Sequence, residues 1–373
     1  MHGGDAAMAL FARMEAYRMR AWTWLIPVVT ILLLAAAGAL APVGPGLAAL
    51  CAAGLGGAVV AAVHHAEVIA HRLGEPFGTL CLALAVTVIE ASLILSMMVA
   101  GGAEMAVLPR DTIYAAIMII CNGVIGLCLL IGGIVHREQA FRVEGAGAGM
   151  AALVVMAALT LVLPVYTTSA PGGAYNHTQL WFLAVSSATL WAVFVFIQTV
   201  RHRDYFLPVD DLGADDHASL PNARAAWASF GWLLVSLVAV VGLAKVLSPT
   251  IEHVVEAAGA PRAVVGIAIA LLVLLPESVA AALAARADRL QTSLNLAVGS
   301  ALASIGLTIP VVVVAAVALD MPLTLGLDPV QLVLLILTFV VSAFTLVSGR
   351  THMMQGVVHL VVFAAFLLMA VVP

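Results

Sequence analysis

Charged side chains are scarce in this sequence: they make up 9% of its 373 residues, whereas 64% of the residues are hydrophobic. A water-soluble domain carries about a quarter charged residues, so this composition excludes a soluble globular protein. The 15 Lys and Arg residues are outnumbered by 20 Asp and Glu residues, and they form no long basic run. The electrostatic footprint of a nucleic-acid-binding protein is therefore absent.

Cysteine is rarer still, with four residues in the chain. The four cysteines all fall within apolar stretches and show no C-x-x-C spacing: Cys51, Cys81, Cys121 and Cys128. This arrangement indicates neither a disulfide framework nor a zinc knuckle. We expect the four thiols to be small apolar packing groups, as buried cysteines commonly are.

Long apolar runs are what the sequence has in abundance. Runs of about 20 apolar residues are long enough to cross the hydrocarbon core of a bilayer as helices. Eleven such runs are bounded by Gly, Pro or charged residues: 22–41, 46–70, 77–100, 111–135, 148–168, 179–200, 226–250, 262–285, 292–318, 328–348 and 352–372. The sequence therefore predicts an all-α polytopic membrane protein with about eleven transmembrane helices.

The arginines predict the orientation of these helices. If the N-terminus is cytoplasmic, twelve arginines fall in cytoplasmic segments, and only Arg110 and Arg262 fall outside. Short loops rich in Lys and Arg stay on the cytoplasmic side of bacterial-type membranes. We therefore expect a multi-pass protein of the cell inner (plasma) membrane, with its N-terminus inside and its C-terminus outside.

An internal repeat relates the two halves of the chain. The segment from Glu67 to Pro76 precedes the apolar run that contains Glu90. The segment 252–261 has Glu, Gly and Pro at the same relative places and precedes the run that contains Glu277. Glu90 falls on the third run and Glu277 on the eighth. Because consecutive runs cross the membrane in alternate directions, this odd separation makes the two halves inverted. Inverted repeats that meet near the bilayer midplane are typical of secondary transporters.

Glu90 and Glu277 are candidate ion ligands. Each lies roughly 14 residues into its helix, which places it near the middle of the hydrocarbon core. A charge at this depth costs at least about 2.5 kcal/mol, so the carboxylates should face a cavity, a partner or an ion. The alternative is a protonated glutamic acid bonded to a neighbouring helix. Burial disfavours an ionised carboxyl whereas a bound cation favours it, so protons and cations should compete for both residues.

Polar residues on the following helices reach a similar depth. Asn122, Ser300 and Ser304 offer oxygen ligands beside the two carboxylates. Plain helix packing is the alternative for Ser304 and Thr308, because small polar residues also let helices approach closely. Pro276 removes a backbone donor and can free carbonyl oxygens for an ion, although a proline kink without function is common in membranes.

A further polar group precedes the first carboxylate helix. Helical spacing places His64, Glu67 and His71 along one face. An entrance lining, an interfacial helix end and a transition-metal site are the three interpretations, of which we favour the entrance or proton pathway. The corresponding acidic residues of the second half are Glu252 and Glu256.

Several phrases resemble the calcium/proton exchanger family of the calcium:cation antiporter superfamily, in particular its bacterial branch of calcium/sodium/potassium proton antiporters. They are His65-Ala-Glu67-Val-Ile-Ala-His71-Arg-Leu-Gly-Glu-Pro76-Phe-Gly-Thr79, Leu84-Ala-Val-Thr-Val-Ile-Glu90, Ile119-Ile-Cys-Asn122-Gly123, Pro276-Glu277-Ser278 and Leu290-Gln-Thr-Ser-Leu-Asn-Leu-Ala-Val-Gly299-Ser300-Ala-Leu-Ala-Ser304-Ile-Gly306-Leu. The resemblance implies one extra N-terminal helix followed by two inverted five-helix repeats. It also implies that the glutamates of the family's cation motifs are Glu90 and Glu277, whereas Thr87 and Leu274 stand where the family has Asn. We count Thr87 among the expected cation-binding residues. Asn122 and Ser300 match the family's polar residues on the next helices.

This organisation divides the chain into four parts. An N-terminal cytoplasmic segment with the first transmembrane helix (1–45) precedes the first five-helix repeat (46–200). An acidic cytoplasmic loop (201–226) then leads to the second five-helix repeat (227–373). The acidic loop is either a solvated linker or a cation sensor through Asp210, Asp211, Asp215 and Asp216; an acidic segment at this place also recurs in the family.

The resulting hypothesis is a secondary active antiporter that exports Ca²⁺ in exchange for H⁺ by alternating access. Hard oxygen ligands with two negative charges suit calcium, and a Na⁺/H⁺ or K⁺/H⁺ antiporter is the alternative. An intramembrane metalloenzyme or a cation channel belongs to a different class, and no H-E-x-x-H motif supports the former. We expect no enzymatic activity, no cofactor and no nucleic-acid partner. The expected partners are small cations, protons and the lipid bilayer, and the sequence is compatible with a homo-oligomer.

Overall fold

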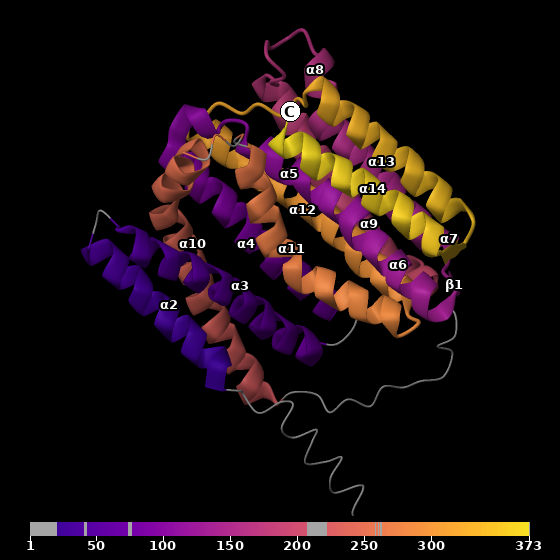
Figure 1. The fold of residues 1–373 in the computed structure, drawn as a ribbon, viewed down its shortest axis with the longest axis horizontal. Coiled ribbons are helices and arrows are strands. Elements are labelled where there is room, and N and C mark those ends of the chain that lie inside the picture. The colour runs from indigo at the N-terminus through magenta and orange to yellow at the C-terminus, as the bar shows by residue number, and fades with distance from the viewer. Residues whose placement is uncertain are drawn as a thin grey trace, which may run out of the picture. The chain divides into compact units, whose positions relative to one another are not determined.

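The computed structural model describes residues 21–40, 43–73, 77–206, 222–257, 259, 261 and 263–372, and these residues are almost entirely helical (Figure 1). Ten helical segments are long and apolar enough to cross a membrane, and a bent pair in α11 makes up to eleven. The segments are α2 (Ala21–Ala39), α3 (Pro45–Leu73), α4 (Phe77–Gly101), α5 to α6 (Leu108–His136), α7 to α8 (Val143–Tyr166), α9 with η4 (His177–Arg201), α10 (Ala223–Ala257), α11 (Ala263–Arg286), α12 (Leu290–Ala318), α13 (Pro329–Val347) and α14 (Met353–Val371). The predicted all-α polytopic fold is confirmed.

The helices begin where local chemistry satisfies their free backbone groups. Asn176 and Gln179 form a capping box at the start of α9, with bonds of 2.9 and 3.0 Å between side chain and backbone. Asp328 and Gln331 form the same arrangement at the start of α13. Such caps satisfy donors that the helix itself leaves unpaired. In lipid this matters strongly, because no water is available to bond them.

Within the part of the chain that the structure describes, three transmembrane segments contain a π-helical stretch, in which each backbone bond spans one residue more than in an α-helix. The first, η2 (Ile119–Val124), separates α5 (Leu108–Met118) from α6 (Ile125–His136) and contains Asn122. The second is η3 (Ala158–Val162), between α7 (Val143–Ala157) and α8 (Leu163–Tyr166), and the third is η4 (Ile197–Arg201). A π-helical stretch rotates the residues that follow it, so the face predicted by a regular helical period is not the face observed.

The chain forms two compact units, each with its own packing. The first comprises residues 1–85 and 213–247 and contains, among its described residues, α2, α3 and the first part of α10. Here Gly54 and Gly242 let helices approach, because a Cβ at these positions would lie 3.0 Å from Leu33 and 2.4 Å from Leu34. The buried His65 ring nitrogen Nε2 lies 3.0 Å from the carbonyl oxygen of Thr23.

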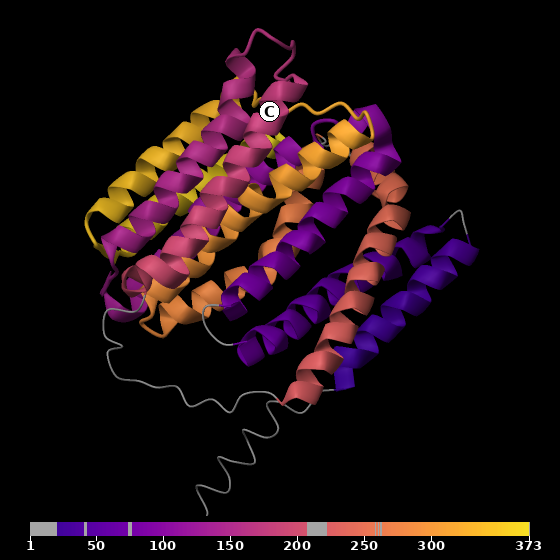
Figure 2. The ribbon, with the colours of Figure 1, turned by 180° about the vertical axis from the view of Figure 1, so that it is seen from behind.

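The second unit comprises residues 86–212 and 248–373 and contains helices from both halves of the sequence. Within it α12 packs against α7, α9 and α11, while α14 packs against α6 and α13 (Figures 1 and 2). The second unit therefore contains segments of both predicted repeats.

Glycines set the distance between α6 and α14. A Cβ on Gly356 would lie 2.5 Å from the backbone nitrogen of Leu130 and 2.8 Å from the carbonyl oxygen of Gly126. A Cβ on Gly133 would lie 2.4 Å from the backbone nitrogen of Met353. Helix backbones in membranes come this close only where the facing residues are small.

Two short strands close one end of the second unit. Strand β1 (Glu138–Ala140) pairs antiparallel with β2 (Arg350–His352), in the register Gln139 to Thr351. The pairing joins the connection between α6 and α7 to the connection between α13 and α14. Gln139 also donates from Nε2 to the carbonyl oxygen of Ala285 at 2.9 Å, which ties the end of α11 to the same corner.

Candidate cation site

Glu90 lies in the middle of α4 and is buried, with 2% of its surface exposed. The Ser304 hydroxyl of α12 donates a hydrogen bond of 2.6 Å to Glu90 Oε2. The Thr308 hydroxyl donates to the same oxygen at the longer distance of 3.4 Å. Among the described residues Glu90 forms no ion pair, so hydroxyl groups provide its polar environment.

Glu277 lies on α11 and is half-buried. The Ser300 hydroxyl of α12 donates a hydrogen bond to Glu277 Oε2. Two pieces of α11, Val264–Leu275 and Glu277–Arg286, are bent by 54° relative to each other. The break falls at Pro276, because proline cannot donate the backbone bond that would continue the helix.

A stripe of hydroxyl groups on α12 therefore serves both carboxylates. Ser300, Ser304 and Thr308 are spaced four residues apart, so they lie on one face of the helix, with about 6 Å between neighbours. Ser300 bonds Glu277, and the two following hydroxyls bond Glu90. The structure thus brings together four of the predicted site residues, Glu90, Glu277, Ser300 and Ser304.

Asn122, which was also expected as a cation ligand, makes its hydrogen bonds outside this group. Its amide nitrogen donates to Thr338 Oγ1 at 2.8 Å, and its amide oxygen lies 3.3 Å from Nδ1 of the buried His359. The second ring nitrogen of His359 lies 3.0 Å from Thr345 Oγ1. The close approach of α6 and α14 and the π-helical stretch η2 explain this placement, since they direct Asn122 toward α13 and α14.

Thr87 is buried on α4, three residues before Glu90, and the matching Leu274 is buried three residues before Glu277. Glu67 is exposed on α3, in the first compact unit. The other expected entrance residues and the acidic-loop residues have side chains outside the described part of the structure: His71, Glu252, Glu256, Asp210, Asp211, Asp215 and Asp216.

Thr308 is the contact that sequence reasoning missed, because it was equally consistent with helix packing. Its spacing of four residues from Ser304 was the available signal. Thr338 and His359 were not expected as the partners of Asn122, since nothing in a one-dimensional pattern links residues more than 200 positions apart.

The site offers hard oxygen donors. Two carboxylates and three hydroxyls are the ligand type that Ca²⁺ and other hard cations take. Within the described residues no group of three or more His, Cys, Asp or Glu side chains is arranged to hold a metal ion. The described cysteines Cys51, Cys121 and Cys128 are free and buried.

The sequence matches the family described as "Sodium/calcium exchanger protein" over residues 43–200 and 228–372. These two segments make up most of the chain. The chain belongs to this family. The resemblance to cation exchangers inferred from the motifs is therefore confirmed.

Two curated relatives cover most of the chain. A Sinorhizobium fredii protein that is named an ionic transporter, y4hA, is 46% identical over 94% of this chain and 96% of its own length. The sodium-potassium/proton antiporter ChaA of Escherichia coli is 36% identical over 82% of this chain and 83% of its own length.

Solved structures show the same fold. The structure of native YfkE matches with a TM-score of 0.70 at 16% identity, over 94% of this chain and all of that one. The H⁺/Ca²⁺ exchanger CAX matches with a TM-score of 0.69 at 16% identity, over 93% of this chain and 87% of that one. The exchanger fold is therefore shared across large sequence differences.

The α12 hydroxyls give a graded prediction. Ser304→Ala should weaken apparent cation affinity about tenfold, because a short bond to a buried carboxylate is lost. Thr308→Val should weaken it only about twofold, since that bond is long. The measurement is the initial transport rate against cation concentration in everted vesicles.

The matched control is Ser236→Ala, which removes a buried hydroxyl that bonds only the Trp232 carbonyl oxygen of its own helix. It should leave affinity unchanged. Equal effects of Ser304→Ala and Ser236→Ala would show that the α12 stripe has no part in cation binding.

Proposed function

We propose that this protein is a secondary active cation/proton antiporter of the inner membrane that works by alternating access at Glu90 and Glu277. The observation that carries the proposal is that carboxylates from α4 and α11 bond hydroxyls one turn apart on α12. The family assignment and a relative named as an antiporter support the same function.

Coupling follows from competition for the same oxygens. A protonated carboxyl cannot serve as an anionic ligand, and a carboxylate that holds a cation has little affinity for a proton. A serine hydroxyl both donates and accepts, so Ser300 and Ser304 bond the free carboxylates and can turn a lone pair toward a bound cation. If the protein switches between its inward-open and outward-open states only when either a cation or protons are bound, cation and protons must move in opposite directions.

We propose Ca²⁺ as the transported cation. Two carboxylates neutralise a divalent charge, and two released protons balance one calcium ion. Hydroxyl oxygens complete a flexible oxygen shell of the kind calcium accepts. Na⁺ or K⁺ is the second candidate, because the Escherichia coli relative is named a sodium-potassium/proton antiporter.

Everted membrane vesicles test both the exchange and the cation. Respiration acidifies the vesicle interior, and a pH-sensitive dye reports proton efflux when Ca²⁺, Na⁺ or K⁺ is added. Ca²⁺-induced efflux in vesicles that contain the protein, and none in control vesicles, is the expected result. Cation movement that leaves the pH gradient intact at zero membrane potential would identify a channel instead.

The inverted arrangement predicts that Arg72 and Arg289 both face the cytoplasm. Arg72 precedes the Glu90 helix and Arg289 follows the Glu277 helix, so the pair reports helix direction; both side chains are exposed. Single cysteines at these positions, in a background without the native cysteines, should react with impermeant maleimide only from the cytoplasmic side.

The exposed Tyr166, at the end of α8, provides the control. The predicted topology places it outside, so Tyr166→Cys should react only from the opposite side. Labelling of either arginine position from outside would contradict the inverted arrangement and the predicted orientation.

A further inference from the structure

The piece of α11 that carries Glu277 is joined to the rest of the helix by the bend at Pro276. The two pieces, Val264–Leu275 and Glu277–Arg286, are bent by 54° relative to each other. Proline removes the backbone bond that would make them one continuous rod. The direction of the second piece therefore depends on what holds its other end, which is the turn into α12.

This turn sets the register between Glu277 and the hydroxyl stripe of α12. Helix α11 ends at Arg286 and α12 begins at Leu290. Glu277 lies nine residues before Arg286, and Ser300 lies ten residues after Leu290, which is about 14 Å along each helix. The two helices pack against each other, so the geometry of the turn determines whether Glu277 and Ser300 meet.

Gln139, from the first half of the sequence, binds this turn through both of its amide hydrogens. It is the buried residue of β1, whereas its neighbours Glu138 and Ala140 are exposed. Its Nε2 donates to the Ala285 carbonyl oxygen at 2.9 Å and to Asp288 Oδ1 at 2.8 Å, beside the end of α11 (Figure 1). A carbonyl and a carboxylate only accept hydrogen bonds, so the amide nitrogen must face them.

Two unfavourable features accompany these bonds. Within the described residues, the buried Oε1 of Gln139 has no hydrogen-bond partner. Asp288 has a φ of 61°, a left-handed conformation that residues other than glycine rarely adopt. Backbone strain of this kind persists only where the surrounding structure holds it. Gln139 binds both the strained residue and a carbonyl three residues before it, so it is well placed to do so.

The rest of the connection between α6 and α7 binds the two sides of the same turn. His136 Nε2 lies 2.8 Å from the Arg286 carbonyl oxygen on the α11 side. The backbone nitrogen of Arg142 donates to Gln291 Oε1 at 2.7 Å on the α12 side. Gln139 lies between these two contacts in sequence and binds Asp288 within the turn itself.

We propose that Gln139 is a positioning residue for Glu277, which acts by holding the turn between α11 and α12. This inference rests on the proposed function, in which Glu277 binds the cation. Loss of the two bonds frees the Glu277 piece to turn about the bend at Pro276. Glu277 then moves away from Ser300, and the cation meets a less complete set of oxygens.

Gln139→Met tests the proposal, because it keeps the length of the side chain and removes both donors. In proteoliposomes it should raise the KM for the cation about tenfold and leave the maximal rate within about twofold. A merely structural role would lower the amount of folded protein, and with it the maximal rate, at an unchanged KM. The control is Gln355→Met, which removes the bond from the His352 backbone nitrogen at the neighbouring turn and should leave KM unchanged.

An exchange of donor and acceptor tests the contact itself. At pH 8, Gln139→Glu places a carboxylate against two acceptors and should raise KM more than Gln139→Met does. Adding Asp288→Asn supplies an amide donor to that carboxylate, so the double variant should regain most of the lost affinity. An equal KM with and without Asp288→Asn would overturn the contact. If Gln139→Met does not fold, the double variant still decides.

Hydrogen exchange of the full-length protein separates the turn from the transport function. Gln139→Met should speed the exchange of backbone amides in 285–290 and not in α14. Unchanged exchange in 285–290, or faster exchange with an unchanged KM, would refute the positioning role. Normal transport by Glu277→Gln would refute the proposed function instead, and hydrogen exchange would still show whether Gln139 holds the turn.

Discussion

Glu90→Gln and Glu277→Gln should each reduce cation/proton exchange to the background rate, a loss of at least about a hundredfold. The amide keeps the shape of the side chain but neither releases a proton nor supplies a negative charge to a cation. Ser300 and Ser304 would still find an oxygen acceptor in the amide, so the local packing should survive. Dye-monitored proton movement in everted vesicles gives the rate.

The folded state provides the control for this prediction. Because an uncharged amide is easier to bury than a carboxylate, both variants should insert normally and unfold at a temperature no lower than the unmodified protein. Glu144→Gln makes the same chemical change at an exposed position in the first turn of α7 and should exchange normally. Near-normal exchange in Glu90→Gln or Glu277→Gln would exclude that glutamate from the site.

The second large effect concerns pH. On the side from which the cation binds, KM for the cation should fall about tenfold per pH unit in the range where one bound cation displaces one proton. In the range where one bound cation displaces a proton from each of the two carboxyls, KM should fall up to about a hundredfold per pH unit. The sign follows from mass action: fewer protons at higher pH leave more free carboxylate for the cation, until both carboxyls are ionised and KM becomes constant.

Proteoliposomes with independently buffered sides measure this dependence. The pH of the opposite side is held constant. The change in driving force that comes from the pH difference is then corrected for separately from the change in cation binding. Ser304→Ala should keep the shape of the profile and shift it to higher cation concentration, because the carboxyls that titrate remain. A KM that does not vary with pH would contradict direct competition between proton and cation.

The sequence alone determined the helices and singled out the two glutamates. An apolar run of about 20 residues has one stable outcome in lipid, because a helix satisfies its own backbone groups and water is unavailable. Glu90 and Glu277 stand out for the same reason, since a carboxyl at mid-depth is costly without a partner. Pro276 likewise marked the place where α11 is bent by 54°.

Only the tertiary structure decided which polar groups meet. Transmembrane helices are apolar on the faces toward lipid and on the faces toward other helices, so periodicity does not identify the inward face. The sequence therefore did not decide whether Ser304 and Thr308 pack helices together or bond a carboxylate. The position of α12 beside Glu90 shows that both hydroxyls bond the carboxylate. Asn122 carried a clear polar signal, yet η2 and the glycine contacts of α6 with α14 direct it to Thr338 and His359.

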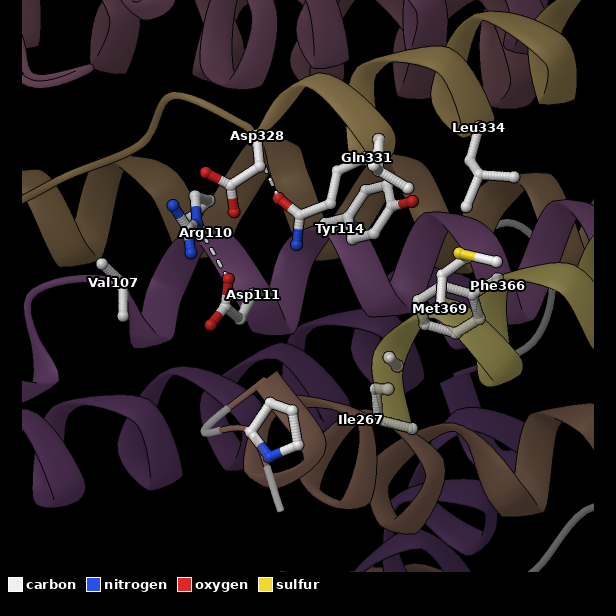
Figure 3. A pocket seen from close by; sticks show the side chains of 13 residues that line it. Val107, Arg110, Asp111, Tyr114, Ile267, Asp328, Gln331, Leu334, Phe366 and Met369 are labelled. Atoms are coloured by element: carbon white, nitrogen blue, oxygen red, sulfur yellow. Dashed lines mark hydrogen bonds and ion pairs between the residues drawn. The ribbon is translucent and has the colours of Figure 1, made fainter. Parts of the chain in front are cut away.

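A cavity within the second compact unit shows the same division between local and tertiary information (Figure 3). Arg110, Asp111 and Tyr114 are close in sequence, and helical spacing alone places Asp111 and Tyr114 on neighbouring positions of one helix. Asp328 and Phe366 reach the same cavity from α13 and α14, more than 200 residues later. Local spacing is fixed by the covalent chain and the helical repeat. Contacts between helices that are distant in sequence depend on how closely the helix backbones can approach. Between α6 and α14 this approach depends on Gly126, Gly133 and Gly356.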